Sequence, residues 1–402
     1  MLAALLVTSC AGGEDKESAP AANPSSSAPH GYVEGAKEAA EQQSRLLLSD
    51  PGTGDTRVLD LITGKEHKVP RVAGGAELTT DGRFGYFHTS RSTQVLDSGS
   101  WMVDHGDHVH YYRAAIREVG KLPGGTGSQV RSDIAVTALT GEDGRVRLYR
   151  RAGLEDGKIP SPRTLPGTYA GAVVPYEEHL LAFSEEDGKT KPVVLDRKGK
   201  RVASLDEKCE EPRGDAVTRR GVVLGCADGA LLVDESDGTF TAERIPYDED
   251  VPEKERATEF RHRSGSDTLT ALAGDSAVRV LDVTKREWTR VDTGPVVAAN
   301  TAGEGSPLLA LRDDGTLRGY DIGTGKEVAK TKPLLTGGQK KGAVGDGEDG
   351  DGGPVIEVDR SRAYVNDPAG KRVHEIDYND DLRIARSFDV GIAPGLMVET
   401  GR

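Results

Sequence analysis

A short β-rich run that ends in aspartate recurs along most of the chain, and this repeat constrains the fold more than any other feature. Its copies end at Asp60, Asp97, Asp196, Asp234, Asp282, Asp321 and Asp377, and a run ending at Tyr149 takes the equivalent place in one further copy. The mean spacing is about 45 residues, close to the length of one β-propeller blade. Glycine-containing turns precede many of these runs, as hairpins require: Asp143-Gly144, Asp228-Gly229 and Asp314-Gly315.

Eight copies predict an all-β fold, a β-propeller with eight blades; seven blades with one decorated copy would also account for the spacing. The first copy, in residues 44–70, supplies only about three strands. The C-terminal run LMVETGR, residues 396–402, could supply the fourth strand and close the ring. Closure matters physically because it leaves no exposed sheet edge between the first and last blades.

The N-terminal residues predict export and a lipid anchor. Residues 1–10 are an apolar run that ends at Cys10, which fits a bacterial lipoprotein signal; the usual positive charges are absent, so we expect the true start further upstream. A lipid on Cys10 would hold the protein at the outer face of the bacterial cell membrane without spanning it. The alternative is a short cytosolic N-terminus in which Cys10 is accidental. Residues 11–43 predict a flexible tether, with a brief helix over 34–43, and residues 44–402 the propeller domain.

Residues 97–112, DSGSWMVDHGDHVHYY, concentrate side chains that can bind a metal. Beyond Asp97, this segment contains three imidazoles and two carboxylates, which belong to His105, His108, His110, Asp104 and Asp107. Alternate residues of a strand point the same way, so His108 and His110 could converge on one ion. Gly106 allows a turn that brings His105 or Asp107 to the same ion. Zinc accepts such a ligand set, although ligand type does not separate it from copper or nickel.

A solvated loop would have a similar composition, but a cation would relieve the repulsion among so many charges. The spacing after Asp97 is longer than average, so we expect this segment to be an insertion at a strand connection of the second blade, near the central channel. His88 and His262 lie in other strand-like regions and are candidate additional ligands. Trp101, Tyr111 and Tyr112 are expected to wall the site by packing.

The stretch DSGSWMVDHGDHVHYY resembles the signature segment of the AztD-type zinc metallochaperones, which are extracytoplasmic β-propellers. GDAVTRRGVVLGCADGALLV, HEIDYNDDLRIAR and LMVETGR are similar in character, so the resemblance covers about residues 44–402. It implies zinc as the bound metal and the solute-binding protein of a zinc ABC transporter as the partner. It also implies that His105, Asp107, His108 and His110 belong to the zinc-binding region.

Two departures from that family concern further zinc sites. No additional flexible tract rich in histidine and aspartate is visible, and Glu210 to Arg213 stand where the family tends to have a histidine. Both argue against a second, weaker zinc site.

Cys209 and Cys226 are the only cysteines besides Cys10. They lie in neighbouring strand-like runs, and the implied compartment is oxidising, so we predict a disulfide between them. It would stabilise the fold by about 3 kcal/mol on the chain-entropy model. The pair lacks CxxC spacing, which disfavours a redox or soft-metal role. Residues 337–354 are glycine-rich and acidic without the EF-hand order, so we expect a solvated connection there.

The formal net charge of -14 disfavours binding to nucleic acid or to an anionic membrane surface. No nucleophile elbow, Walker loop, HExxH motif or dinucleotide fingerprint is present. We therefore expect a monomeric zinc carrier that is not an enzyme, and that loses zinc when its histidines are protonated. The alternatives are a non-catalytic propeller that binds a protein or cell-wall ligand, and a zinc hydrolase with Asp104 or Asp107 as general base.

Overall fold

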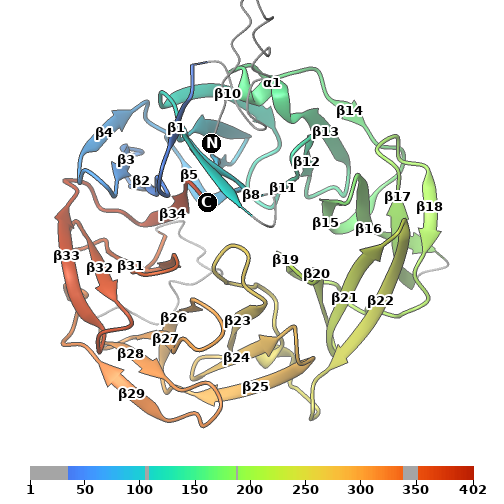
Figure 1. The fold of residues 1–402 in the computed structure, drawn as a ribbon. Helices are drawn as coiled ribbons and strands as arrows, with labels where there is room; N and C mark the ends of the chain where they lie inside the picture. The colour runs from blue at the N-terminus through green and yellow to red at the C-terminus, as the bar shows by residue number, and fades with distance from the viewer. Residues whose placement is uncertain (1–34, 105–107, 187–188, 338–351) are drawn as a thin grey trace, which may run out of the picture. The chain divides into compact units, whose positions relative to one another are not determined.

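The computed structural model describes residues 35–104, 108–186, 189–337 and 352–402. Within these ranges the chain is almost entirely β-structure (Figure 1), with one short helix, α1 (Arg151–Glu155), and one 3-10 turn, η1 (Glu253–Glu255). None of the described helices is long and apolar enough to cross a bilayer. Cys10 and residues 1–34 lie outside the described ranges, so the lipid anchor stays a prediction.

The first four sheets are antiparallel and have four strands each. The first contains β34 (Leu396–Thr400), β2 (Arg45–Ser49), β3 (Thr56–Asp60) and β4 (Glu66–Val69). The second contains β5 (Gly75–Thr80), β6 (Phe84–Thr89), β7 (Ser92–Asp97) and β10 (Arg117–Pro123). The third contains β11 (Gln129–Ser132), β12 (Val136–Thr140), β13 (Val146–Arg150) and β14 (Arg163–Thr164). The fourth contains β15 (Tyr169–Tyr176), β16 (His179–Glu186), β17 (Lys189–Leu195) and β18 (Arg201–Ser204).

The next four sheets repeat the same pattern of neighbouring antiparallel strands. The fifth contains β19 (Asp215–Thr218), β20 (Gly221–Cys226), β21 (Gly229–Ser236) and β22 (Thr239–Pro246). The sixth has three strands, β23 (Thr268–Ala273), β24 (Ala277–Asp282) and β25 (Glu287–Asp292). The seventh contains β26 (Val296–Thr301), β27 (Leu308–Arg312), β28 (Leu317–Tyr320) and β29 (Glu327–Lys330). The eighth contains β30 (Ile356–Val358), β31 (Ala363–Asp367), β32 (Arg372–Asp377) and β33 (Arg383–Asp389).

The repeated aspartate has the same structural role in several sheets, which explains why the pattern recurs. It lies at or just after the end of the strand, and its carboxylate accepts a backbone hydrogen bond from the turn that follows. The N–H groups of Thr63, Lys285 and Thr324 are 2.9, 2.9 and 2.7 Å from the Oδ1 atoms of the aspartates three residues earlier. Such a bond stabilises a tight turn, so in these sheets aspartate marks the point where the strand reverses.

Apolar clusters join each sheet to the next. The cluster between the first and second sheets includes Leu47 and Phe87, and the cluster between the seventh and eighth includes Leu311 and Ile376. A further cluster packs Leu46 of the first sheet with residues of the eighth sheet, such as Val373. The prediction of an all-β fold built from four-stranded antiparallel sheets, consistent with a propeller, is confirmed (Figure 1).

The C-terminal run pairs with the first sheet, as its sequence suggested. β34 lies antiparallel to β2, with Leu46 opposite Glu399 and Leu48 opposite Met397. The pairing gives β2 a partner on each side, because β3 lies on the other. The first sheet is therefore assembled from the two ends of the described chain.

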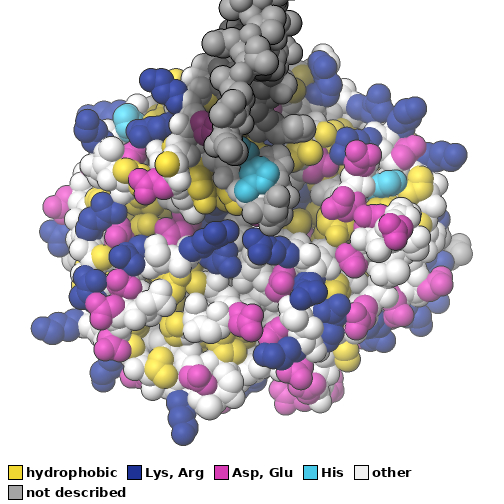
Figure 2. All heavy atoms as spheres, viewed as in Figure 1, with side chains coloured by type: hydrophobic (Ala, Val, Ile, Leu, Met, Phe, Trp, Pro, Cys, Tyr) yellow, Lys and Arg dark blue, Asp and Glu magenta, His cyan; other side chains and the backbone are white. Residues whose placement is uncertain are grey.

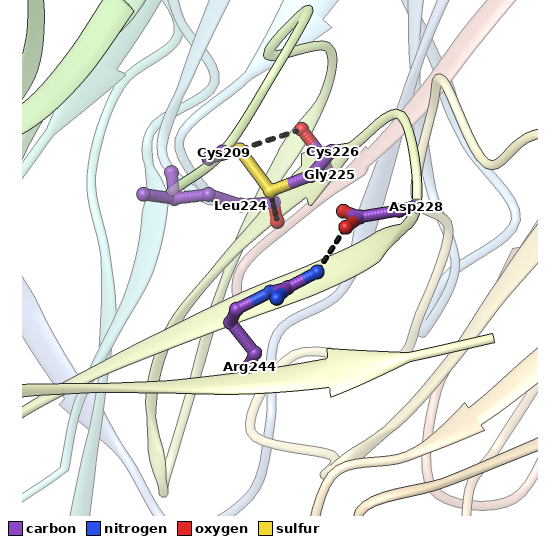
Figure 3. Close-up of a disulfide and its surroundings, with 6 residues drawn as sticks. All are labelled: Cys209, Leu224, Gly225, Cys226, Asp228 and Arg244. Carbon is purple, nitrogen blue, oxygen red and sulfur yellow. Dashed lines mark hydrogen bonds and ion pairs between the residues drawn. A yellow bond between two sulfur atoms is a disulfide. The ribbon is translucent and has the colours of Figure 1, made fainter. Parts of the chain in front are cut away.

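The predicted disulfide is confirmed. Cys209 and Cys226 are bonded with an S–S distance of 2.00 Å, and both are almost completely buried between the fourth and fifth sheets (Figure 3). Close to the bond, Arg244 on β22 forms an ion pair with Asp228, which lies in the turn between β20 and β21 (Figure 3). Such pairs are common in this protein, and Figure 2 shows basic and acidic side chains interspersed over one face.

One local prediction is wrong. A helix is expected over residues 34–43, but residues 35–43, the described part of that range, contain none, and Lys37–Ala39 instead forms a strand, β1. It pairs with β9 (Val109–Arg113), which in turn pairs with β8 (Ser100–Asp104), so the three make a small additional sheet. Part of the range assigned to the tether therefore contributes to this sheet. The local helix preference is overridden because β9 offers an unpaired edge.

Candidate metal site

The histidine segment forms a hairpin that leaves the second sheet after β7 and returns to it at β10. Gly99 makes this departure feasible: its φ is +67°, and a Cβ at this position would lie 2.5 Å from the carbonyl oxygen of Ala114. The carboxylate of Asp97 accepts the Gly99 N–H at 2.9 Å. The expected insertion at a strand connection of the second sheet is thus what the structure shows.

The base of the hairpin is fixed by aromatic packing. Trp101 and Tyr112 lie opposite each other and stack with ring centroids 5.4 Å apart, and both are buried. The guanidinium of Arg83 lies 3.7 Å from the centroid of Trp101, while Asp97 accepts hydrogen bonds from Arg83 at 2.9 and 3.2 Å. This anchor attaches the hairpin to the second sheet, in keeping with the packing role expected of Trp101 and Tyr112.

His108 and His110 lie side by side farther along the same hairpin. Their ring centroids are 4.9 Å apart, as expected for alternate residues on one side of an extended chain. Asp104 lies opposite Val109, so the register directs it to the other face of the hairpin. The Oδ2 atom of Asp104 is 3.5 Å from Nη2 of Arg219, which lies in the turn between β19 and β20 of the fifth sheet.

Glu38 on β1 supplies a carboxylate to this site that the sequence did not reveal. Its Oε1 atom lies 2.7 Å from Nδ1 of His110. An ionised carboxylate can only accept, so Nδ1 carries the proton, and in the neutral imidazole the lone pair is then on Nε2. A carboxylate on one ring nitrogen is the usual arrangement for a histidine that binds metal through the other. Spacing along the chain gave no signal for Glu38, because it is 72 residues from His110.

The motif is described only in part. His105 and Asp107 lie outside the described residues, between β8 and β9. In the part of the chain that the structure describes, no group of three His, Cys, Asp or Glu side chains is arranged to hold a metal. The described half of the motif therefore provides two adjacent imidazoles, one of them oriented by Glu38.

The two candidate additional ligands have other surroundings. His88 on β6 is fully buried, with Nδ1 2.9 Å from the Thr93 hydroxyl and Nε2 3.1 Å from the Thr79 hydroxyl. Burial lowers the pKa of His88 to about 4, so the ring is neutral. Burial, together with the charge of Arg402, also lowers the pKa of His262 to about 4. Binding a metal at His88 would require the loss of a threonine contact; ligation by either residue stays a prediction.

Paired charges connect sheets that are far apart in the sequence. Arg131 on β11 makes two hydrogen bonds to Asp215 on β19, at 2.6 and 2.8 Å. Arg402 forms an ion pair with Glu357 on β30 at 3.1 Å. Each of these carboxylates is neutralised by the arginine beside it. We therefore interpret the two ion pairs as links between sheets and not as a cation site.

The fold and this hairpin define a class: an all-β, propeller-type protein that carries a histidine hairpin outside its regular sheets. The crystal structure of AztD from Citrobacter koseri is similar to this chain, with a TM-score of 0.74 and 18% sequence identity. The match covers 90% of this chain and 98% of that chain. The apo form of the same protein matches with a TM-score of 0.71 and 17% identity over the same shares. The expected AztD-type fold is confirmed.

A more distant match is the dihydro-heme d1 dehydrogenase NirN in complex with DHE. Its TM-score is 0.53 at 12% identity, covering 89% of this chain and 75% of that chain. No protein-family model and no curated protein matches the sequence.

Proposed function

We propose that this protein is a zinc metallochaperone that carries the ion outside the cytoplasm and passes it to the solute-binding protein of a zinc ABC transporter. The observation that carries the proposal is the pair of imidazoles on the hairpin, with the Nδ1 atom of His110 held by Glu38 at 2.7 Å. The fold shared with AztD supports the same assignment. The disulfide supports an oxidising compartment, and a lipid on Cys10 would keep the protein at the membrane surface.

In this proposal His108 and His110 bind zinc, and His105 and Asp107 complete a four-coordinate set. Neutral imidazole is a strong zinc ligand, and three nitrogen ligands with one carboxylate form a common tetrahedral site. Glu38 holds the His110 ring and makes it a better electron donor. Asp104 stays on its ion pair with Arg219 and orients the end of β8.

The position of the site suits transfer rather than storage. The side chain of His110 is 25% exposed and that of Glu38 49% exposed, so a partner can reach the ligands. An incoming ligand of the partner can then replace one imidazole at a time. A site closed by four thiolates would release zinc far more slowly, and the two cysteines of the domain are instead joined to each other.

The regular sheets act as the rigid support of the hairpin. We propose that the eight sheets are eight blades and that the pairing of β34 with β2 closes their ring. Closure removes the sheet edges that would otherwise be exposed at the two ends. A rigid ring keeps the anchor at Trp101 in place while the end of the hairpin exchanges its ligands.

Zinc affinity tests the site directly. A competition titration against a chromophoric chelator is expected to show tight, one-to-one binding in the native protein and a loss of at least about 100-fold when His108 and His110 are both changed to alanine. His67→Ala, an exposed histidine on β4, is the matched control and should leave affinity unchanged. Equal affinity in all three proteins would remove the site assignment.

Transfer needs a separate measurement. Zinc-loaded protein is mixed with the metal-free solute-binding protein, either freely or across a dialysis membrane. Direct transfer predicts a rate that rises with acceptor concentration in the free mixture and a much slower rate across the membrane. Identical rates in the two arrangements would show that zinc simply dissociates, and the protein would then be a zinc-binding protein without a chaperone role.

A further inference from the structure

A cavity of about 500 Å³ lies near the base of the hairpin, between the first and second sheets. Its wall is formed by β4, the start of β2, the end of β7 and the connection from β9 to β10. The cations that line it are Arg45, Lys68, Arg113 and Arg117, whereas Glu118 is the one carboxylate in the described lining. The cavity is distinct from the histidine pair and independent of the proposed zinc function.

The arginines that line the cavity do not each have a carboxylate of their own. Asp60 accepts from Arg113 at 2.7 Å and is also the partner of Arg45, at 3.7 Å. Asp97, in the same way, pairs with Arg117 at 3.2 Å and with Arg83 at 2.9 Å, although Arg83 also has Glu155 at 3.6 Å. Lys68 has no carboxylate partner among the described residues. The cations that line the cavity are therefore only partly neutralised, although the chain as a whole has a net charge of -14.

Arg45 is the most deeply buried of the cations that line the cavity. The residue is 3% exposed, and its Nε atom makes no hydrogen bond among the described residues, with the carboxylate of Asp60 lying 3.7 Å away. Its Nη1 group is used by the carbonyl oxygen of Ser98. Burial lowers the pKa of Arg45, with the neighbouring charge of Arg113 acting in the same direction. A buried guanidinium that shares its one carboxylate with a second arginine is only partly neutralised, and an anion in the cavity would reduce the cost of burying that charge.

We propose that this cavity binds a small multivalent oxyanion, such as a phosphate or a polycarboxylate. Guanidinium groups recognise the planar pairs of oxygen atoms in these anions, and a lysine ammonium adds a further donor. A large polyanion is disfavoured because the acidic surface repels it, whereas a small ion inside the cavity interacts mainly with the cations of the wall. The cavity volume also suits a ligand of small size.

The test uses the full-length, metal-free protein, because citrate and phosphate themselves bind zinc. Calorimetric titrations with citrate and with inorganic phosphate are compared at constant ionic strength, with chloride as the reference anion. We expect saturable binding of at least one oxyanion. Lys68→Gln should weaken it by about ten-fold, and Lys68→Glu by more. Lys121→Gln, an exposed lysine on β10 that does not line the cavity, is the matched control and should bind like the native protein.

Lys68 is exposed on β4, so its variants are expected to fold, which unfolding curves can verify. Binding that is equally strong in the Lys68 and Lys121 variants would place the anion elsewhere and overturn the proposal. Binding of an acidic peptide without any binding of citrate or phosphate would also overturn it, in favour of a protein partner.

Discussion

The second sheet and the hairpin that leaves it are made by one continuous stretch of chain, yet they use histidine in opposite ways. His88, on β6, is fully buried with both ring nitrogens beside threonine hydroxyls. His110, on β9, is partly exposed, with one nitrogen held by Glu38 and a second imidazole 4.9 Å away. The first arrangement satisfies a side chain inside the protein; in the proposed function, the second orients an imidazole for a metal.

The difference shows that the surroundings of a histidine, more than its position in a motif, decide its role. Burial lowers the pKa of His88 to about 4, and the threonines then complete the hydrogen bonding of the neutral ring. A carboxylate beside His110 instead fixes the tautomer in which Nε2 can act as a ligand. Changes to the scaffold should therefore alter stability, and changes to the hairpin should alter zinc binding.

The largest effect is expected from removing residues 396–402, which deletes β34. Leu396, Met397 and Val398 are buried, and each contributes about 1.5–3 kcal/mol. The loss would approach the total stability of a typical domain and leave β2 as an open edge. We expect no cooperative unfolding transition in calorimetry. Replacing residues 104–109 with Asn-Gly, which shortens only the hairpin, should preserve the transition, and a similar collapse there would contradict the comparison.

The second largest effect is expected from shortening the hairpin in the same way and measuring zinc instead. This variant lacks His105, Asp107 and His108, so chelator competition should show at least about a 100-fold loss of affinity. The melting temperature in the absence of zinc should change little. Retained affinity would mean that zinc binds elsewhere, with His262 as the next residue to test.

A smaller effect on stability is expected from His88→Ala. The change leaves a cavity and deprives the Thr79 and Thr93 hydroxyls of their partner, at a cost of about 2–4 kcal/mol. Urea unfolding measures it, and zinc affinity should remain within about two-fold of the native value if the residue is purely structural. A ten-fold loss of affinity in folded protein would instead make His88 a ligand.

Glu38→Gln is expected to have a moderate effect on zinc alone. The amide keeps the size of the side chain but no longer carries the charge that favours the bound ion, so affinity should fall by about ten-fold. Glu41→Gln, a change of the same kind at an exposed residue beyond β1, is the matched control. An unchanged affinity for Glu38→Gln would show that the contact with His110 does not support a metal.

The last effect is confined to part of the pH range and concerns the scaffold. Burial on β34 raises the pKa of Glu399 to about 8 from its ordinary value of 4.5, so the native state keeps a proton that the unfolded chain releases. This group therefore lowers stability progressively as pH rises from about 4.5 to 8. Glu399→Gln should be more stable than the native protein at pH 8 and similar to it at pH 4, as measured by urea unfolding. A pH-independent difference would rule out this cause.

Much of the scaffold could be predicted from the sequence because its signals are local. The runs that end in aspartate correspond to one strand in each regular sheet except the third, where the run ends at Tyr149, and in several of them the carboxylate stabilises the turn that immediately follows. The C-terminal run had no partner nearby and the first copy lacked a strand, which indicated the pairing of β34 with β2. Cys226 ends β20, and Cys209 lies 17 residues earlier in the connection between β18 and β19, so their disulfide required only a short path.

The candidate site was predicted less completely. The alternation of His108 and His110 indicated their shared side correctly, and the long spacing after Asp97 indicated an insertion. Glu38 was missed because the composition around it is typical of a tether, and Arg219 was missed because it reaches Asp104 from the fifth sheet. Neither contact leaves a trace in the spacing of neighbouring residues.

The sequence by itself determined the strand and turn pattern, the concentration of histidine and aspartate in one short segment and the cysteine pair. Each depends on interactions between residues that are close along the chain or between runs with matching patterns. Only the tertiary structure decided that Glu38 holds His110, that Arg219 pairs with Asp104 and that His88 is enclosed by threonines. The contacts of Glu38 with His110 and of Arg219 with Asp104 form only when distant segments of the chain are brought together. The free energy that holds these segments in place comes from the packing of all the sheets rather than from the residues in contact.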